Sequence, residues 1–207
     1  MPSPQTKPRQ LPRVAVLLAT YNGARWLDEQ LDSILSQQDV QVRVIALDDG
    51  STDGTDERLT ERAATEPRLT VLPRRDPSGS AAANFYRLLL TAETKPDELV
   101  AFADQDDRWR PGKLARHAEL LSRGGYDGVS SNVSSFTSDG RHTLVRKDYP
   151  QRPFDFLLES AGPGSTFLMT HRLVELMRHT LRNDDSLAQQ VHRHDWLTYA
   201  VARSHGL

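Results

Sequence analysis

Apolar runs and helical repeats alternate along the first 123 residues of the chain. The short apolar runs, several of them rich in β-branched residues, have the length and composition of buried strands. We expect such strands at 14–18, 42–47, 69–72 and 99–103. After each run, apolar residues recur every three or four positions, as they do on one face of a helix. The matching helices are expected at 26–35, 51–64, 82–90 and 111–122.

This order of elements predicts an α/β fold. Strand and helix alternate four times, which is typical of a mostly parallel, open sheet with right-handed crossovers and helices on both faces. Two local signals support the expected helix starts. Ser51 or Asp53 is expected to cap the second helix, and Pro111 suits the first turn of the fourth helix.

The second part of the chain has a different pattern. Residues 129–136 alternate between polar and apolar side chains, which predicts one half-exposed strand, and residues 165–170 are a further strand candidate. Two helices are expected at 172–182 and 195–203. No linker divides the chain. We therefore expect one domain over residues 13–207, after a disordered tail of residues 1–12 that is rich in proline and charge.

The composition narrows the choice of function class. The 207 residues include 26 basic and 28 acidic side chains, so the net charge is -2. A nucleic-acid-binding protein usually has a basic excess, and nothing here indicates that partner. The chain has no cysteine, which excludes disulfides and thiolate metal sites. It also lacks an apolar run of about 18 residues, so no membrane-spanning segment is expected.

Polar signatures follow three of the predicted strands. They are Ala19-Thr20-Tyr21-Asn22, Asp48-Asp49-Gly50-Ser51 and Asp104-Gln105-Asp106-Asp107. In an open α/β sheet ligands bind beyond the carboxyl ends of the strands, so we expect five aspartates at one edge. Clustered carboxylates repel one another unless a cation lies among them. Oxygen ligands without cysteine favour Mg²⁺ or Mn²⁺, which commonly share a site with phosphates.

Each signature alone also has a simpler explanation. Asp-Asp-Gly-Ser is a common turn and helix cap, and an acidic turn after a strand is not in itself a metal site. The three signatures in one chain are harder to explain in this way. The sequence has neither the GxxxxGK[ST] phosphate loop nor the GxGxxG fingerprint, so standard ATPases and dinucleotide-binding enzymes lose support.

Several stretches together carry a family resemblance. They are VAVLLATYNGARWLDEQLDSILSQQ, VRVIALDDGSTDGTDERL, GSAAANFYRLL, LVAFADQDDRWRPGKL, GPGSTFLMTHRLVELM, and HDW at residues 194–196. In this order they resemble the inverting family 2 glycosyltransferases, which have the GT-A nucleotide-diphospho-sugar transferase fold. FADQDDRWRPGKL is especially similar to the bacterial branch that contains rhamnosyltransferase-like enzymes of surface polysaccharide synthesis. The resemblance covers nearly all of the chain after residue 13.

The resemblance implies a nucleotide site at the ends of the first two strands. Ala19, Thr20 and Tyr21 would line the base and ribose pocket. Asp49 would accept a hydrogen bond from the pyrimidine ring N–H. The donor would be dTDP-rhamnose or a UDP-hexose, and residues 13–123 would form the nucleotide-binding half of the domain.

The resemblance also implies a metal site and a catalytic base. Asp104 would face the ribose or the metal, and Asp106 would bind the Mg²⁺ or Mn²⁺ that accompanies the diphosphate. Asp107 would share that metal role. Asp195 would be the catalytic base, at the start of a helix whose dipole favours its charged form.

Residues 124–207 would form the acceptor-binding half. His194 and Trp196 would contact the acceptor, which is expected to be a saccharide or a lipid-linked saccharide. The enzyme would work in the cytoplasm, at the inner face of the cell membrane and with peripheral membrane contact at most. The family pattern continues beyond HDW and often has an aromatic residue where this chain has Leu197. Because this chain stops at Leu207, a complete and a truncated acceptor half both remain open.

Two other functions compete with inverting sugar transfer. A nucleotidyltransferase also combines an α/β nucleotide fold with acidic metal ligands, but it usually has a glycine-rich, basic phosphate loop after the first strand. This chain has Thr20-Tyr21-Asn22-Gly23 at that place. The second alternative is a catalytically inactive domain that only binds a sugar nucleotide, and the retained aspartates count against it.

Overall fold

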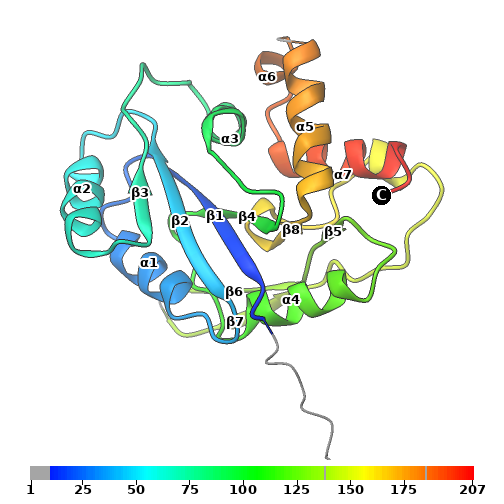
Figure 1. Ribbon diagram of the computed structural model, residues 1–207, viewed down its shortest axis with the longest axis horizontal. Helices are drawn as coiled ribbons and strands as arrows, with labels where there is room; N and C mark the ends of the chain where they lie inside the picture. The colour runs from blue at the N-terminus through cyan, green and yellow to red at the C-terminus, as the bar shows by residue number, and fades with distance from the viewer. Residues whose placement is uncertain (1–9, 138, 185) are drawn as a thin grey trace, which may run out of the picture.

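The computed structural model describes residues 10–137, 139–184 and 186–207. The strands are β1 (Arg13–Thr20), β2 (Gln41–Asp48), β3 (Leu69–Val71), β4 (Glu98–Asp104), β5 (Gly128–Val129), β6 (Val133–Phe136), β7 (His142–Val145) and β8 (Leu168–Met169). The α-helices are α1 (Leu27–Leu35), α2 (Thr55–Thr65), α3 (Ala81–Thr91), α4 (Lys113–Ser122), α5 (His171–Asn183), α6 (Leu187–Gln190) and α7 (His194–Ser204). Two short 3-10 helices are η1 (Asp155–Leu157) and η2 (Gly164–Thr166). Figure 1 shows their arrangement.

The main sheet brings the three polar signatures to one edge. Its six strands lie in the order β3-β2-β1-β4-β8-β5, and β1 pairs in parallel with both β2 and β4. The register places Thr20 opposite Asp48 and Ala19 opposite Asp104, so these strands end at the same level. The predicted mostly parallel, open sheet is confirmed. β8 pairs antiparallel with both β4 and β5.

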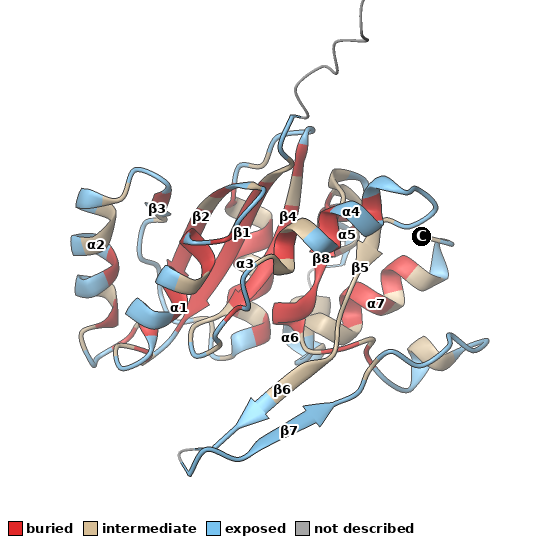
Figure 2. Cartoon of the chain, turned by 90° about the horizontal axis from the view of Figure 1, so that it is seen from below, coloured by how far each residue is buried: buried red, intermediate tan, exposed pale blue. Residues whose placement is uncertain are grey.

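Helices cover both faces of the sheet because the strands bury alternate side chains on opposite sides. In β1, Leu17 and Ala19 belong to the core formed with α3, α5 and α7. Val16 and Leu18 belong to the core on the other face, with α1, α2 and α4. Figure 2 shows the central strands largely as buried residues, with the helices buried along one side. The periodicity of the sequence therefore predicted this layering correctly.

Two predicted helix starts are wrong. Neither Ser51 nor Asp53 occupies the cap position of α2, which is Gly54 with a φ of 91°. The Asp53 carboxylate still accepts the backbone N–H of Thr55, the first residue of the helix, at 3.1 Å. Pro111 does not lie in the first turn of α4. Gly112, with a φ of 75°, separates it from the helix, so Pro111 belongs to the preceding turn.

The predicted strand at residues 129–136 is two strands in different sheets. β5 belongs to the main sheet, whereas β6 pairs with β7 in a separate hairpin that projects from the body of the molecule (Figure 2). The candidate at 165–170 is η2 followed by the two residues of β8. β7 was not predicted, because all of its residues are exposed and leave no apolar pattern. The helices expected at 172–182 and 195–203 are confirmed as α5 and α7.

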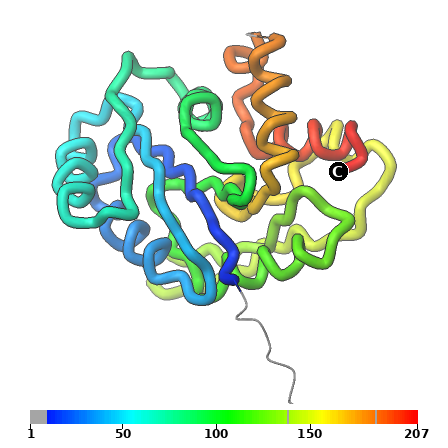
Figure 3. The backbone as a smooth tube through the Cα atoms, viewed as in Figure 1, coloured from blue at the N-terminus to red at the C-terminus, as the bar shows by residue number. Residues whose placement is uncertain are grey.

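The last helix packs beside the segment that follows the hairpin. Figure 3 shows α7 next to the loop around η1. Asp155 of η1 accepts a hydrogen bond from Arg203 of α7 at 2.7 Å. Residues 1–9 of the expected tail lie outside the described residues. Within the described part of the chain, no helix combines the length and the hydropathy that a bilayer crossing requires.

Candidate active site

A cavity of about 330 Å³ lies where β1, β2 and β4 end. Its walls come from these strand ends, from the segment 77–81 and from the first turns of α3. It collects every residue expected to bind the nucleotide, namely Ala19, Thr20, Tyr21, Asp49 and Asp104. Asp106 also lines it. The other expected site residues are not among its lining residues: Asp107, His194, Asp195 and Trp196.

The carboxylate of Asp48 is hydrogen-bonded within its own turn. Its carboxylate accepts hydrogen bonds from the Thr20 hydroxyl at 2.9 Å and from the backbone N–H groups of Gly50 at 3.0 Å and Ser51 at 2.8 Å. The side chain is buried. Because these donors take up most of its acceptor capacity, Asp48 builds the turn and has little capacity left for a ligand.

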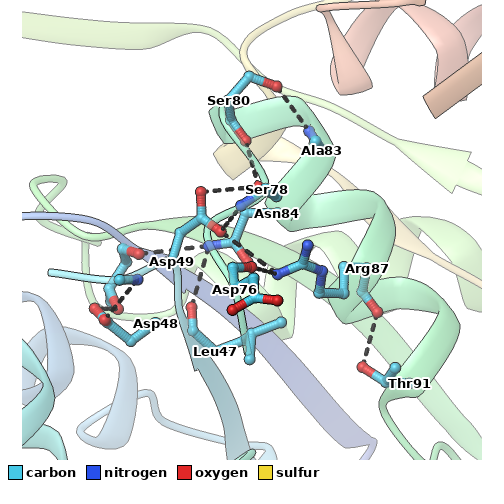
Figure 4. A network of polar contacts seen from close by, with 12 residues as sticks. Leu47, Asp48, Asp49, Asp76, Ser78, Ser80, Ala83, Asn84, Arg87 and Thr91 are labelled. Atoms are coloured by element: carbon cyan, nitrogen blue, oxygen red, sulfur yellow. Dashed lines mark hydrogen bonds and ion pairs between the residues drawn. The ribbon is translucent and has the colours of Figure 1, made fainter. Parts of the chain in front are cut away.

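Asp49 lines the cavity and contacts the segment before α3 through polar side chains, as Figure 4 shows. Its two oxygens accept the backbone N–H of Ser78 at 2.6 Å and the Ser78 hydroxyl at 2.8 Å. Arg87 of α3 lies 3.7 Å from the same carboxylate and donates to the Asp76 carbonyl at 2.6 Å. One carboxylate thus anchors the segment 76–80. Each carboxylate oxygen has a second lone pair, so Asp49 can also accept a ring N–H.

Asn84 of α3 connects the ends of β1 and β2. Its amide donates to the carbonyls of Leu47 at 3.2 Å and Thr20 at 3.4 Å (Figure 4). The side chain is buried, and its Oδ1 has no hydrogen-bond partner among the described residues. These bonds set the spacing between Thr20 and the turn that carries Asp49.

Gln105 attaches the acidic turn to the end of β1. Its side chain accepts the backbone N–H of Tyr21 and donates to the Tyr21 carbonyl, both at 2.7 Å. Gly23 packs closely against it, since a Cβ at that position would lie 2.2 Å from Gln105 Oε1. The middle residue of Asp104-Gln105-Asp106 is therefore structural, and the aspartates on either side remain available to a ligand.

Asp104 is the most crowded carboxyl group of the site. Burial, with the charges of Asp107, Asp106 and Asp195, raises the pKa of Asp104 to about 7. The Ser165 side chain opposes this rise in the pKa of Asp104. Both burial and neighbouring like charges disfavour a carboxylate, so the site carries negative charge that the surrounding protein neutralises only in part.

This donor set fits Mg²⁺ or Mn²⁺. Asp104 and Asp106 place hard oxygen ligands on the cavity wall, and a divalent ion would relieve the crowding that raises the pKa of Asp104. Among the described residues, no three His, Asp or Glu side chains already surround a common point. Ions of this kind are often bound by one or two carboxylates and take their other ligands from water and substrate phosphates.

Asp195 is the second residue of α7 and does not line the cavity. Its charge contributes to the raised pKa of Asp104. One of its oxygens accepts the backbone N–H of Trp196 at 2.8 Å, and the other lies 3.6 Å from Arg193. Its side chain is 14% exposed. Trp196 is partly buried against the core.

His194 packs against the aromatic core. Its ring stacks on Phe85 with centroids 3.9 Å apart and meets Phe102 edge-on at 5.4 Å. Its Nε2 lies against Gly164 and has no hydrogen-bond partner in the part of the chain that the structure describes. Burial lowers the pKa of His194 to about 4, so the ring is neutral at pH 7. Its expected contact with the acceptor stays a prediction, whereas its packing role is observed.

A sequence comparison now decides the family. The model of Glycosyl transferase family 2 matches residues 15–182. The chain belongs to glycosyl transferase family 2. It is also 35% identical over 188 residues to the dTDP-rhamnosyl transferase RfbG of Shigella flexneri. This match covers 90% of the chain but 65% of that relative, so the chain spans less than two thirds of the relative's length.

Solved structures share the fold of this family 2 chain. The mannosyltransferase PcManGT from Pyrobaculum calidifontis, in complex with GDP-Man and Mn2+, aligns with a TM-score of 0.58 and 26% identity over 81% of this chain and 47% of that chain. TarS 1-349 from S. aureus, in complex with UDP-GlcNAc, aligns with a TM-score of 0.62 and 20% identity over 92% of this chain and 53% of that chain. The expected GT-A fold is therefore confirmed.

Some residues that build this family 2 site were not predicted from the sequence. Ser78, Asn84 and Gln105 position the cavity walls, and a hydrogen bond from Lys113 to the Ser165 carbonyl joins the start of α4 to η2. Asn84 left a usable signal, because it is a polar residue on the apolar face of α3. Ser78 left none, since a serine in a loop is ordinary.

Proposed function

We propose that the chain transfers a sugar from a nucleoside diphosphate to a hydroxyl acceptor, with inversion at the sugar carbon. One observation supports this most strongly. Asp49, Asp104 and Asp106 surround a single cavity, and Asp195 is close enough for its charge to act on Asp104. Three kinds of carboxylate are thus close together. Asp49 would bind the nucleobase, Asp104 and Asp106 would bind the metal diphosphate, and Asp195 is the candidate general base.

The donor is dTDP-rhamnose or a UDP-hexose. Ala19, Thr20 and Tyr21 line the base and ribose region, and Asp49 accepts the ring N–H of the pyrimidine. The relative that is 35% identical bears the name dTDP-rhamnosyl transferase, which favours dTDP-rhamnose. All the residues that line the cavity belong to the proposed nucleotide-binding half, residues 13–123.

In the reaction, the chain's carboxylates act on the leaving group and on the nucleophile. Asp104 and Asp106, with Asp107 nearby, would hold Mg²⁺ or Mn²⁺, and the bound ion would supply Lewis-acid neutralisation of the charge on the departing diphosphate. Asp195 takes the proton of the acceptor hydroxyl as the new bond forms, an effect typically worth about 10²–10⁴-fold. A single displacement at the sugar carbon inverts its configuration.

The acceptor is a saccharide or a lipid-linked saccharide, and it approaches from the half formed by residues 124–207. Asp195 and Trp196 both belong to this half, and Trp196 offers an apolar wall to a sugar face. We place the reaction in the cytoplasm, at the inner face of the cell membrane, where lipid-linked saccharides are extended.

Release of nucleoside diphosphate tests the proposal. The protein is incubated with Mn²⁺ and, in turn, dTDP-rhamnose, UDP-glucose or GDP-mannose. We expect slow release of dTDP or UDP, which EDTA stops and Asp106→Ala abolishes. A nucleotidyltransferase would instead release pyrophosphate from a nucleoside triphosphate and a sugar phosphate. An inactive binding domain would bind a sugar nucleotide and release nothing.

A further inference from the structure

A second cavity, of about 470 Å³, lies in the half formed by residues 124–207. Its volume is within the range of roughly 300–1,000 Å³ that is common for small-molecule sites. Its walls come from residues 130–131, 147–152 and 159–161, and from Tyr199 of α7. Among the described residues, this cavity and the one at the strand ends share no lining residue.

Hydrogen bonds hold one wall of this second cavity in place. At the start of the segment 147–152, the Asn132 side chain accepts the backbone N–H of Lys147 at 2.5 Å. At its end, Asp155 accepts the backbone N–H of Arg152 at 2.8 Å. The same Asp155 carboxylate accepts the Tyr199 hydroxyl at 3.2 Å, which ties the wall to α7. The wall is therefore fixed at both ends.

The second cavity lies one turn of α7 from the candidate general base. Tyr199 follows Asp195 by four positions, and side chains four positions apart lie on the same face of a helix. At about 1.5 Å per residue, they are separated by only about 6 Å along the axis. The wall at 159–161 also leads to Gly164, which packs against His194, the residue before Asp195. One extended molecule can therefore reach both places.

The charges that line the second cavity nearly balance. Two are basic and three are acidic: Lys147, Arg152, Asp148, Asp155 and Glu159. Lys147 lies 3.7 Å from Glu159, so part of this charge is paired within the cavity wall. An anion such as phosphate would meet three carboxylates, which is unfavourable. Hydroxyl groups both donate and accept hydrogen bonds, so a neutral ligand rich in hydroxyls can pair with acidic and basic side chains alike.

Tyr149 adds an aromatic surface to these polar groups. It lines the cavity and is 64% exposed. The guanidinium group of Arg146 lies 5.7 Å from the ring centroid, a cation–π contact that restrains the ring. An exposed aromatic ring beside groups that bind hydroxyls suits a sugar, which has apolar C–H faces and a polar rim. Gln151 contributes an amide that can donate and accept.

We propose that the second cavity is a binding site for a neutral saccharide, and that it holds the part of the acceptor next to the sugar that reacts at Asp195. The inference rests on the proposed function for the ligand's role as an acceptor. The affinity of the cavity for a neutral saccharide does not depend on sugar transfer. An oligosaccharide should be a better acceptor than a monosaccharide, because only the longer molecule reaches both places.

Saccharide binding without donor or metal is the first test. Ligand-observed NMR in EDTA uses three probes: maltotriose, chitotriose and an α-1,3-linked rhamnose trisaccharide. We expect at least one to bind, and Tyr149→Ala should raise its Kd by about fivefold or more. Tyr149→Phe keeps the ring and should stay within about twofold of the wild type. Phe136→Ala is the matched control, because Phe136 is a 52% exposed aromatic residue of the hairpin that does not line the cavity.

Three outcomes of this test would overturn the proposal. The first is that none of the three trisaccharides binds to the wild-type protein. The second is that Tyr149→Ala leaves the Kd unchanged, or that Phe136→Ala raises it as much. The third is that millimolar inorganic phosphate displaces the bound trisaccharide, because the cavity would then be an anion site.

Acceptor length is the second test, and it uses the donor that nucleotide release identifies. The KM of the wild-type enzyme should be lower for the trisaccharide than for the matching methyl monosaccharide. The ratio of the two KM values should fall by about fivefold in Tyr149→Ala and should not change in Phe136→Ala. If trisaccharides bind but no donor is turned over, the saccharide site stands and the proposed function fails. If transfer occurs and Tyr149→Ala leaves the ratio unchanged, the proposed function stands and the saccharide site is refuted.

Discussion

Two neighbouring aspartates at the end of β2 have different tasks. Asp48 is taken up by donors of its own turn, whereas Asp49 binds Ser78 and also faces the cavity. We expect Asp49→Ala to weaken binding of dTDP or UDP by roughly 1.5–3 kcal/mol, as for a lost hydrogen bond to a charged group. The loss should not depend on the sugar attached. Calorimetry with the free nucleotide and with two sugar nucleotides measures both points.

Ser78→Ala separates a direct contact of Asp49 from its support of the loop. This change removes the hydroxyl bond to Asp49 but keeps the backbone N–H bond. We expect nucleotide affinity to change by less than about fivefold, because one neutral donor is lost and the loop stays anchored. If Ser78→Ala weakens binding as much as Asp49→Ala does, Asp49 acts through the loop alone.

Asp195 is the residue whose chemistry can be tested with the smallest change in shape. An amide is close in size to a carboxylate and can still accept the N–H of Trp196, but it cannot take up the acceptor's proton. Asp195→Asn should leave the melting temperature and the donor Kd nearly unchanged. It should lower the transfer rate by about 10²–10⁴-fold. A normal rate in this variant would remove Asp195 from the mechanism.

Asp195→Ala provides the structural comparison. If Asp195 only caps α7, the Asn variant should be silent and the Ala variant should cost about 1 kcal/mol of stability. The pattern expected for a general base is different, because both variants then lose transfer activity to a similar extent.

At the scale of elements, η2 and the start of α7 pack closely against each other at Gly164. A Cβ on this residue would lie 2.0 Å from Nε2 of His194. Because Phe85 and Phe102 flank the His194 ring, the ring cannot easily move aside. Gly164→Ala should therefore lower the free energy of unfolding by roughly 1–3 kcal/mol. It should also slow transfer, since Asp195 directly follows His194. Urea unfolding and transfer kinetics measure these effects.

Removal of the His194 ring provides the control for this steric argument. In a His194→Ala background the added methyl group of Gly164→Ala has room, so it should cost no more than about 0.5 kcal/mol. Additive losses of stability in the double variant would mean that Gly164 is needed for another reason.

At the scale of the whole molecule, a buried histidine makes the stability depend on pH. Burial, assisted by the charges of Lys113 and Arg116, lowers the pKa of His117 from 6.5 to about 4. Between these values the unfolded chain binds a proton that the native protein does not. The contribution of His117 is therefore present above pH 6.5 and is lost as the pH falls toward 4.

His117→Gln isolates this contribution, because every other titrating group is common to both proteins. From about pH 7 to pH 4, the wild-type free energy of unfolding should fall by up to roughly 3 kcal/mol more than that of the variant. Urea titrations at several pH values measure the difference. Parallel pH curves would show that His117 titrates equally in the native and unfolded states.

The amino-acid sequence by itself determined the family and the order of the elements up to residue 122. The buried strands and amphipathic helices up to residue 122 follow from spacing between consecutive residues, and the structure contains all of them. The polar signatures follow the strands directly, so their place at one sheet edge was also predictable. The prediction of a single strand at 129–136 was wrong. Whether a short segment joins one sheet or two depends on the strands that pair with it and not on its own residues.

Only the tertiary structure decided what each polar side chain does. Asp48 and Asp49 are neighbours of the same type, yet Ser78, brought close by the loop before α3, binds one and not the other. Lys113 joins the start of α4 to η2 because Ser165, 52 residues further along the chain, accepts its hydrogen bond. His194 is partly buried because α7 packs on Phe85, 109 positions earlier. Such contacts depend on how distant segments pack, and no local pattern of hydrophobic and polar residues encodes them.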